Sequence, residues 1–175
     1  LFHRGRMPGH ARPMDMRVST LHPTMRGRPG GRHCGAAQGH GQVFQVSVVT
    51  RNRMACFADF HVAWTAVRAF LDPAALGDSR LLAWVLLPDR VAWLLEGGRQ
   101  MPMEKAVSRM KSLSAVQVNR TLFRAGPLWE AGFSASALPA GDDPRQAARR
   151  LIVQPLQAGL ADEVMDYPFW DCVWL

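Results

Sequence analysis

Residues 81–95 read LLAWVLLPDRVAWLL, and this stretch decides the fold. Leu81 to Leu87 form a continuous apolar run of strand length, which predicts a strand buried on both faces. Pro88 and Asp89 interrupt the run, and Val91 to Leu95 resume it as a second apolar strand. The stretch therefore predicts two neighbouring strands at the centre of a sheet.

The segment before this stretch predicts a strand and then a helix. Residues 42–50 read QVFQVSVVT, a β-branched sequence that places Phe44, Val46 and Val48 on one face of a strand. Asp59 is a suitable cap for the helix that follows. Its apolar positions recur at helical spacing, which predicts a buried stripe of Phe60, Trp64, Val67 and Leu71.

A long helix is expected after the two central strands. Pro102 suits its first turn, and the helical pattern continues to about Arg124. One face of this helix is apolar, and its side chains are expected to be buried: Met103, Val107, Met110 and Leu113. The opposite face is expected to be exposed to solvent and carries Lys105, Arg109 and Lys111.

A short strand and a third helix complete the pattern. Residues 133–138 (FSASAL) alternate as a strand does, and Asp143-Pro144 opens a helix from Arg145 to about Gln154, which Pro155 ends. The order strand-helix-strand-strand-helix-strand-helix predicts the α+β class. We expect a ferredoxin-like antiparallel sheet with helices on one face.

Charge divides the chain into two parts. Residues 1–40 hold seven Arg against one acid, Asp15, whereas residues 41–175 hold fourteen Lys or Arg against thirteen Asp or Glu. We therefore predict a flexible basic arm over residues 1–40, rich in Arg, Gly and Pro, and a single folded domain over residues 41–175. Such an arm either attracts polyanions or only keeps the protein in solution, and charge alone does not separate the two.

The cysteines and the apolar runs indicate the cellular compartment of the protein. Cys34, Cys56 and Cys172 lie far apart without metal-ligand spacing, so neither a disulfide scaffold nor a structural zinc site is expected. No apolar run approaches the ~18 residues that a membrane span requires. We expect a cytoplasmic protein without a membrane partner, which in a bacterium could associate with the nucleoid.

Segments along most of the chain resemble, in order, those of the REP-associated tyrosine transposases, a branch of the HUH single-strand DNA transposases. They cover residues 31–175 and comprise Gly31 to His33, Val48 to Arg53, Phe57 to Asp59, Leu82 to Asp89, Met110 to Ala115, Asn119, Leu128 to Phe133, Pro155 to Leu160 and Asp166 to Asp171. One segment would be weak evidence, but this many in register form a specific signal. The resemblance implies an HUH transposase-like domain.

The resemblance also implies a metal-dependent reaction at defined positions. Two His at i and i+2 of one strand hold Mg or Mn, because alternate strand residues share a face. A Tyr on a helix attacks the scissile phosphate, and an amide four residues later adds a ligand. In this sequence the two His positions hold Arg90 and Ala92, and the Tyr position holds Arg150. Gln154 keeps the amide.

These replacements remove the implied chemistry but leave cations for nucleic acid. Arginine stays protonated and repels a metal, and alanine offers no lone pair. We therefore expect a DNA-binding protein without catalytic residues, bound metal or cofactor, whose partner is single-stranded or hairpin DNA. The candidate nucleic-acid-binding residues are Arg90, Arg150, Arg51, Arg53, Lys105, Arg109 and Lys111. Arg90 and Arg150 are expected to converge, with an acid such as Glu96 or Glu130 between them if no phosphate is bound there.

Three other interpretations stay open. An active transposase could use Ser134, Ser136 or Tyr167 as its nucleophile, although no metal-ligand set accompanies them. An RNA-recognition-motif-like protein shares this order of elements. Such a protein binds bases with exposed aromatic residues of its strands, whereas residues 42–50 contain one aromatic residue, Phe44. A decayed transposase without a function would keep the same apolar pattern.

Overall fold

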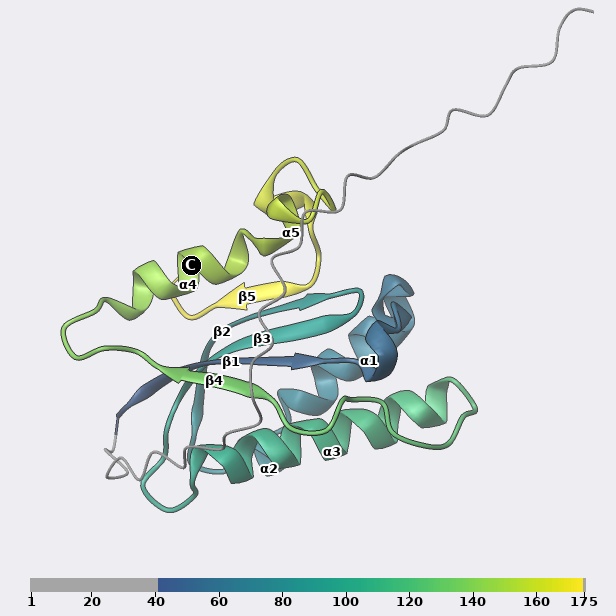
Figure 1. Cartoon of the computed structure of the whole chain (residues 1–175), viewed down its shortest axis with the longest axis horizontal. Coiled ribbons are helices and arrows are strands. Elements are labelled where there is room, and N and C mark those ends of the chain that lie inside the picture. Colours follow the sequence, from purple (N-terminus) through teal and green to yellow (C-terminus); the bar gives the residue numbers. More distant parts are fainter. Residues whose placement is uncertain (1–40, 175) are drawn as a thin grey trace, which may run out of the picture. The chain divides into compact units, whose positions relative to one another are not determined.

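The computed structural model describes residues 41–174, and the arm predicted over residues 1–40 lies outside the described residues. The described strands form one antiparallel sheet in the order β4-β1-β3-β2-β5 (Figure 1). The strands are β1 (Val43–Val49), β2 (Arg80–Leu87), β3 (Arg90–Glu96), β4 (Ser134–Ala137) and β5 (Trp170–Cys172). The two apolar strands of the deciding stretch, β2 and β3, pair with each other in the interior of this sheet, as their sequence predicts.

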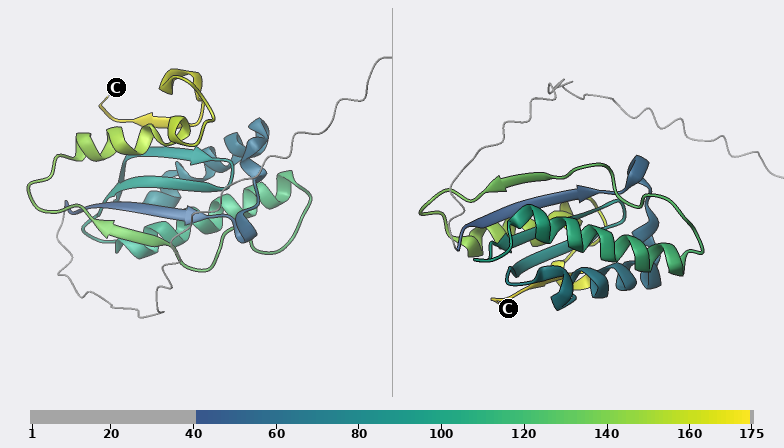
Figure 2. Two further views of the ribbon diagram at one scale, coloured as in Figure 1. Left: turned by 45° about the horizontal axis from the view of Figure 1, so that its top comes forward. Right: turned by 90° about the horizontal axis from the view of Figure 1, so that it is seen from below.

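The helices lie on both faces of the sheet (Figures 1 and 2). One face carries α1 (Phe60–Phe70), α2 (Pro73–Leu76) and α3 (Met103–Thr121), and the other carries α4 (Pro144–Ile152), which lies against β2 and β3. The α+β class and the antiparallel sheet are confirmed. The expectation of helices on one face alone needs a correction, because β2 and β3 are apolar on both faces and α4 covers the second one.

Helix α1 begins as predicted but buries a different face. The side chain of Asp59 accepts a hydrogen bond from the Val62 N–H at 3.0 Å, which caps the first turn. Of the expected stripe only Val67 is buried, since Phe60 is 56% exposed, Trp64 is 49% exposed and Leu71 is 37% exposed. The helix instead buries Val62, Ala63, Ala66, Val67, Ala69 and Phe70. On this face Phe70 packs against Trp84 and Trp93 of the sheet, with ring centroids 5.4 and 5.5 Å apart.

The chain after α4 adds elements that periodicity did not predict. Pro155 does not end helical structure but lies in the first turn of a short helix, α5 (Gln154–Gln157), where a missing N–H does no harm. The last strand, β5, pairs antiparallel with β2 through Trp170 opposite Val85. No helix within residues 41–174 is long and apolar enough to cross a membrane.

A buried junction joins the end of β1 to the β2–β3 turn. Thr50 is fully buried, and its hydroxyl donates to the Met54 carbonyl at 2.8 Å and is 2.9 Å from the Asp89 carbonyl. The Trp129 indole N–H donates a hydrogen bond to the Ser114 hydroxyl of α3 at 3.0 Å. The Trp129 ring also packs against Phe57, with ring centroids 5.3 Å apart. The contacts of Thr50 with the Asp89 carbonyl hold the β2–β3 turn, where the candidate site begins.

Candidate functional site

The pleat of β3 decides which side chains share a face. Trp93 lies against Phe70 of α1, with ring centroids 5.5 Å apart, so it points to the face of α1 and α3. Arg90 and Ala92 therefore point to the opposite face, the face of α4, because strand residues alternate. Ala92 pairs across the sheet with Ser47 of β1 and is 2% exposed. The position at which the resemblance implies a metal-binding His presents a methyl group in this chain.

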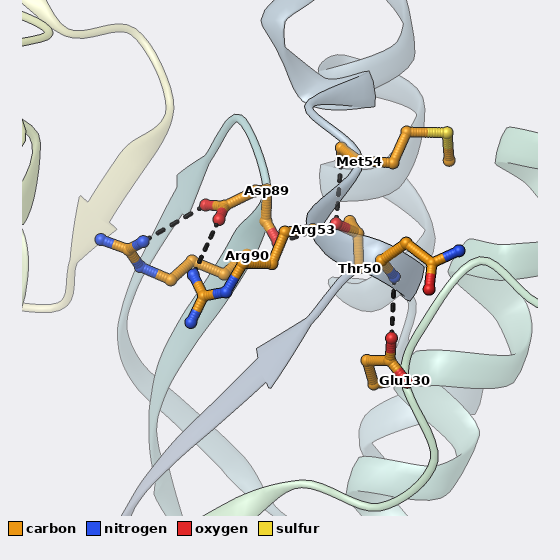
Figure 3. A network of polar contacts seen from close by, with 7 residues as sticks. Thr50, Arg53, Met54, Asp89, Arg90 and Glu130 are labelled. Atoms are coloured by element: carbon orange, nitrogen blue, oxygen red, sulfur yellow. Dashed lines mark hydrogen bonds and ion pairs between the residues drawn. The ribbon is translucent and has the colours of Figure 1, made fainter. Parts of the chain in front are cut away.

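Arg90 shares one carboxylate with a second arginine. Its Nη1 lies 3.3 Å from an oxygen of Asp89, and the Nη1 of Arg53 lies 3.1 Å from the other oxygen (Figure 3). The expected acids are elsewhere: Glu96 pairs with Arg80, and Glu130 accepts the Asn52 N–H at 2.7 Å. Two guanidinium groups on one carboxylate leave a net positive charge at this turn.

Arg150 lies on α4, on the same face of the sheet as Arg90. The helix buries Ala147, Ala148, Leu151 and Ile152 against the sheet, and Arg149 lies toward β5. A helix turns by about 100° per residue, so Arg150 lies on the flank that faces away from β5 and toward β3. Arg150 is exposed, and no ion pair involves it within residues 41–174. The structure thus brings Arg90 and Arg150 to the same face of the sheet.

The residues at these positions do not fit a divalent metal. Arg90 offers a permanent cation, Ala92 offers no donor atom, and Gln154 is a single neutral amide. Within the described part of the chain, no three His, Cys, Asp or Glu side chains lie close enough to hold a metal ion.

Arg51 and Arg53 stand on a sharply turned segment beside Arg90. Asn52 and Arg53 have φ angles of 55° and 52°, in the left-handed region that L-residues rarely adopt. The segment is held by backbone bonds, because the Arg51 N–H donates to the Leu128 carbonyl at 2.7 Å. Both arginine side chains remain exposed, so the strained turn presents them to solvent.

The three candidate cations of α3 have different surroundings. Lys105 and Arg109 are exposed, as predicted. Lys111 is half-buried, and its ammonium donates to the carbonyls of Glu130 and Gly132. Burial lowers the pKa of Lys111 below its ordinary value. Lys111 therefore ties the segment 130–132 to α3, and the expectation that it points outward needs this correction.

The alternative nucleophiles lack the surroundings that nucleophilic catalysis requires. The hydroxyl of Tyr167 is buried and donates to the Leu86 carbonyl at 2.7 Å, and burial raises its pKa to about 12. Ser134 and Ser136 are exposed on β4. A serine acts as a nucleophile only when a neighbouring base takes its proton. The one histidine among the described residues, His61, lies on α1 on the other side of the sheet.

Sequence reasoning missed a second group of cations on α4. Arg145 and Arg149 line a hollow together with Ile152, Cys172 and Trp174. Their spacing of four residues is a helical signal that the sequence does carry. The pairing of β5 with β2, which brings Cys172 and Trp174 beside α4, has no such signal in a three-residue strand.

The fold is similar to that of two solved structures. One is a REP-associated tyrosine transposase bound to a REP hairpin, with a TM-score of 0.63 and 18% identity over 77% of this chain and 79% of that chain. The other is a candidate transposase from Deinococcus radiodurans R1, with a TM-score of 0.50 and 19% identity over 72% of this chain and 95% of that chain. No protein-family model and no curated protein matches the sequence. The resemblance to transposases predicted from the sequence is thus confirmed at the level of the fold.

Proposed function

We propose that this protein binds single-stranded or hairpin DNA and does not cleave it. The observation that carries the proposal is the pair of side chains on β3. A transposase of this fold would hold a metal there, and this chain presents Arg90, paired with Asp89, and the buried methyl of Ala92. A guanidinium binds a phosphate well but cannot coordinate the metal that would activate it.

The distribution of charge supports binding. Arg90 and Arg150 share the α4 face of the sheet, and Arg51 and Arg53 are exposed at the adjoining turn. Each arginine placed on a phosphate releases a condensed counterion, which favours association. The similar transposase was solved bound to a REP hairpin, and that likeness supports the choice of a hairpin nucleic acid as the partner.

The arrangement of β1 argues against an RNA-recognition-motif protein. Such proteins stack bases on aromatic side chains of an open sheet face. Phe44 pairs with Leu95 and so points, like Trp93, to the face covered by α1 and α3. The α4 face of β1 presents Gln45 and Ser47 instead, which have no ring to stack on a base.

Equilibrium binding tests the proposal. Fluorescence anisotropy is measured with the full-length protein and a labelled DNA hairpin, an unstructured single strand and an RNA hairpin, each at two salt concentrations. We expect binding of both DNA probes, with an affinity that falls as salt rises by a log–log slope of about 0.7 per phosphate contact on a single strand. Absence of DNA binding, or a clear preference for RNA, would overturn the proposal.

A further inference from the structure

A hollow of about 210 Å³ lies between α4 and the chain around β5. It opens on the flank of α4 opposite Arg150, and its lining consists of Arg145, Arg149, Ile152, Cys172 and Trp174. We call it the α4–β5 hollow. None of these residues takes part in the site around Arg90, and the function proposed above does not use them.

The charged wall of the α4–β5 hollow consists of two arginines that stand one helical turn apart on α4. Arg145 and Arg149 are exposed and lie about 6 Å apart along the helix, one turn from each other. In the described part of the chain neither forms an ion pair, in contrast to Arg53, Arg80 and Arg90. Two like charges at this distance repel each other, so a bound anion would stabilise the arrangement.

The other wall of the hollow is apolar and includes an indole. Ile152 and Cys172 are 8% and 6% exposed, and Trp174 is half-buried between the core and solvent. Trp84, Trp93 and Trp129 are buried in the core, so their rings cannot meet a ligand. A partly exposed indole beside cations is the combination on which single-stranded nucleic acids bind, by base stacking and phosphate pairing.

We propose that the α4–β5 hollow binds one unpaired nucleotide of a single strand, with its base on Trp174 and the adjoining phosphates on Arg145 and Arg149. This inference rests on the proposed function, because it adds a second contact for the same nucleic-acid partner. A paired base cannot enter the hollow, since a duplex keeps its bases stacked inside. The site therefore distinguishes single-stranded DNA from a blunt hairpin.

Binding of two probes by full-length variants tests this subsite. The probes are labelled oligothymidylate, which has only unpaired bases, and a blunt DNA hairpin whose stem strands are joined by a non-nucleotide linker, so that every base is paired. We expect R145A/R149A to bind oligothymidylate roughly tenfold or more weakly, with a salt slope flattened by about 1.4 for two lost phosphate contacts. We expect W174A to lose roughly tenfold and W174F to retain most of the affinity, because phenylalanine still stacks. The affinity for the blunt hairpin should not change.

The control is R99A/R120A, which removes the same charge from exposed positions in the loop after β3 and on α3. Equal losses for this control and for R145A/R149A would overturn the subsite and leave the proposed function standing. The subsite would also be overturned if R145A/R149A lost binding of an acidic peptide while its affinity for oligothymidylate did not change. A wild-type protein that binds neither DNA probe would overturn the proposed function and this subsite together.

Discussion

Replacing both Arg90 and Arg150 with alanine should weaken binding of a DNA hairpin by roughly one to two orders of magnitude, since a hydrogen bond to a charged group contributes about 1.5–3 kcal/mol. The melting temperature should change little. Arg150 is exposed and has no ion pair among the described residues, and Asp89 keeps its contact with Arg53 at 3.1 Å when Arg90 is removed. Anisotropy titration and thermal unfolding of the same preparation measure the two effects.

The charge-matched variant R68A/R120A separates a local effect from a loss of net charge. It should bind the hairpin nearly as well as the wild type, because its two arginines lie on α1 and α3 on the other face of the sheet. The opposite result for R90A/R150A, lower stability with unchanged affinity, would mean that Arg90 only holds the β2–β3 turn through Asp89.

The second large effect concerns Tyr167, the single tyrosine of the chain. Burial raises its pKa to about 12, whereas an unfolded tyrosine has a pKa of about 10. The unfolded state therefore loses its phenol proton first as the pH rises. The stabilisation from the neutral phenol is complete below pH ~10 and is lost between about pH 10 and 12, a change of about 2–3 kcal/mol in the free energy of unfolding.

Denaturant unfolding at a series of alkaline pH values measures this loss, and absorbance of the phenolate follows the titration directly. The control is Y167F, which lacks the hydrogen bond to the Leu86 carbonyl and should be less stable at neutral pH by about 0.5–1.5 kcal/mol. Its stability should lack the alkaline step of the wild type. A native phenol that titrates near its ordinary value would show that Tyr167 is accessible and would reopen its role as a nucleophile.

The fold could be predicted wherever one pattern dominated the local sequence. The apolar runs at 81–87 and 91–95 have the length of strands rather than of helices, and they became β2 and β3. Helix α1 carried two apolar stripes, and the stripe that is buried places Phe70 against Trp84 and Trp93 of the sheet. The helices on both faces follow from the same fact as the central strands, that β2 and β3 are apolar on both sides.

The candidate site could be predicted in its positions but not in its partners. The two-residue spacing of Arg90 and Ala92 fixed their common face, which the structure confirms through the orientation of Trp93. The partner of Arg90 is Asp89, its own neighbour in sequence, rather than a distant glutamate. Lys111 turned inward because the carbonyls of Glu130 and Gly132 lay within its reach, and a contact between segments so far apart has no local signal.

The most direct test of the account is one incubation examined on two gels. Full-length protein is mixed with a labelled DNA hairpin that carries single-stranded flanks, in the presence of Mg²⁺ or Mn²⁺, and the sample is divided between a native and a denaturing gel. We predict a shifted band on the native gel and only free, uncut DNA on the denaturing gel, because Arg90 and Ala92 cannot hold the metal and Arg150 cannot act as the nucleophile. A covalent protein–DNA band or a shortened strand on the denaturing gel would contradict the account.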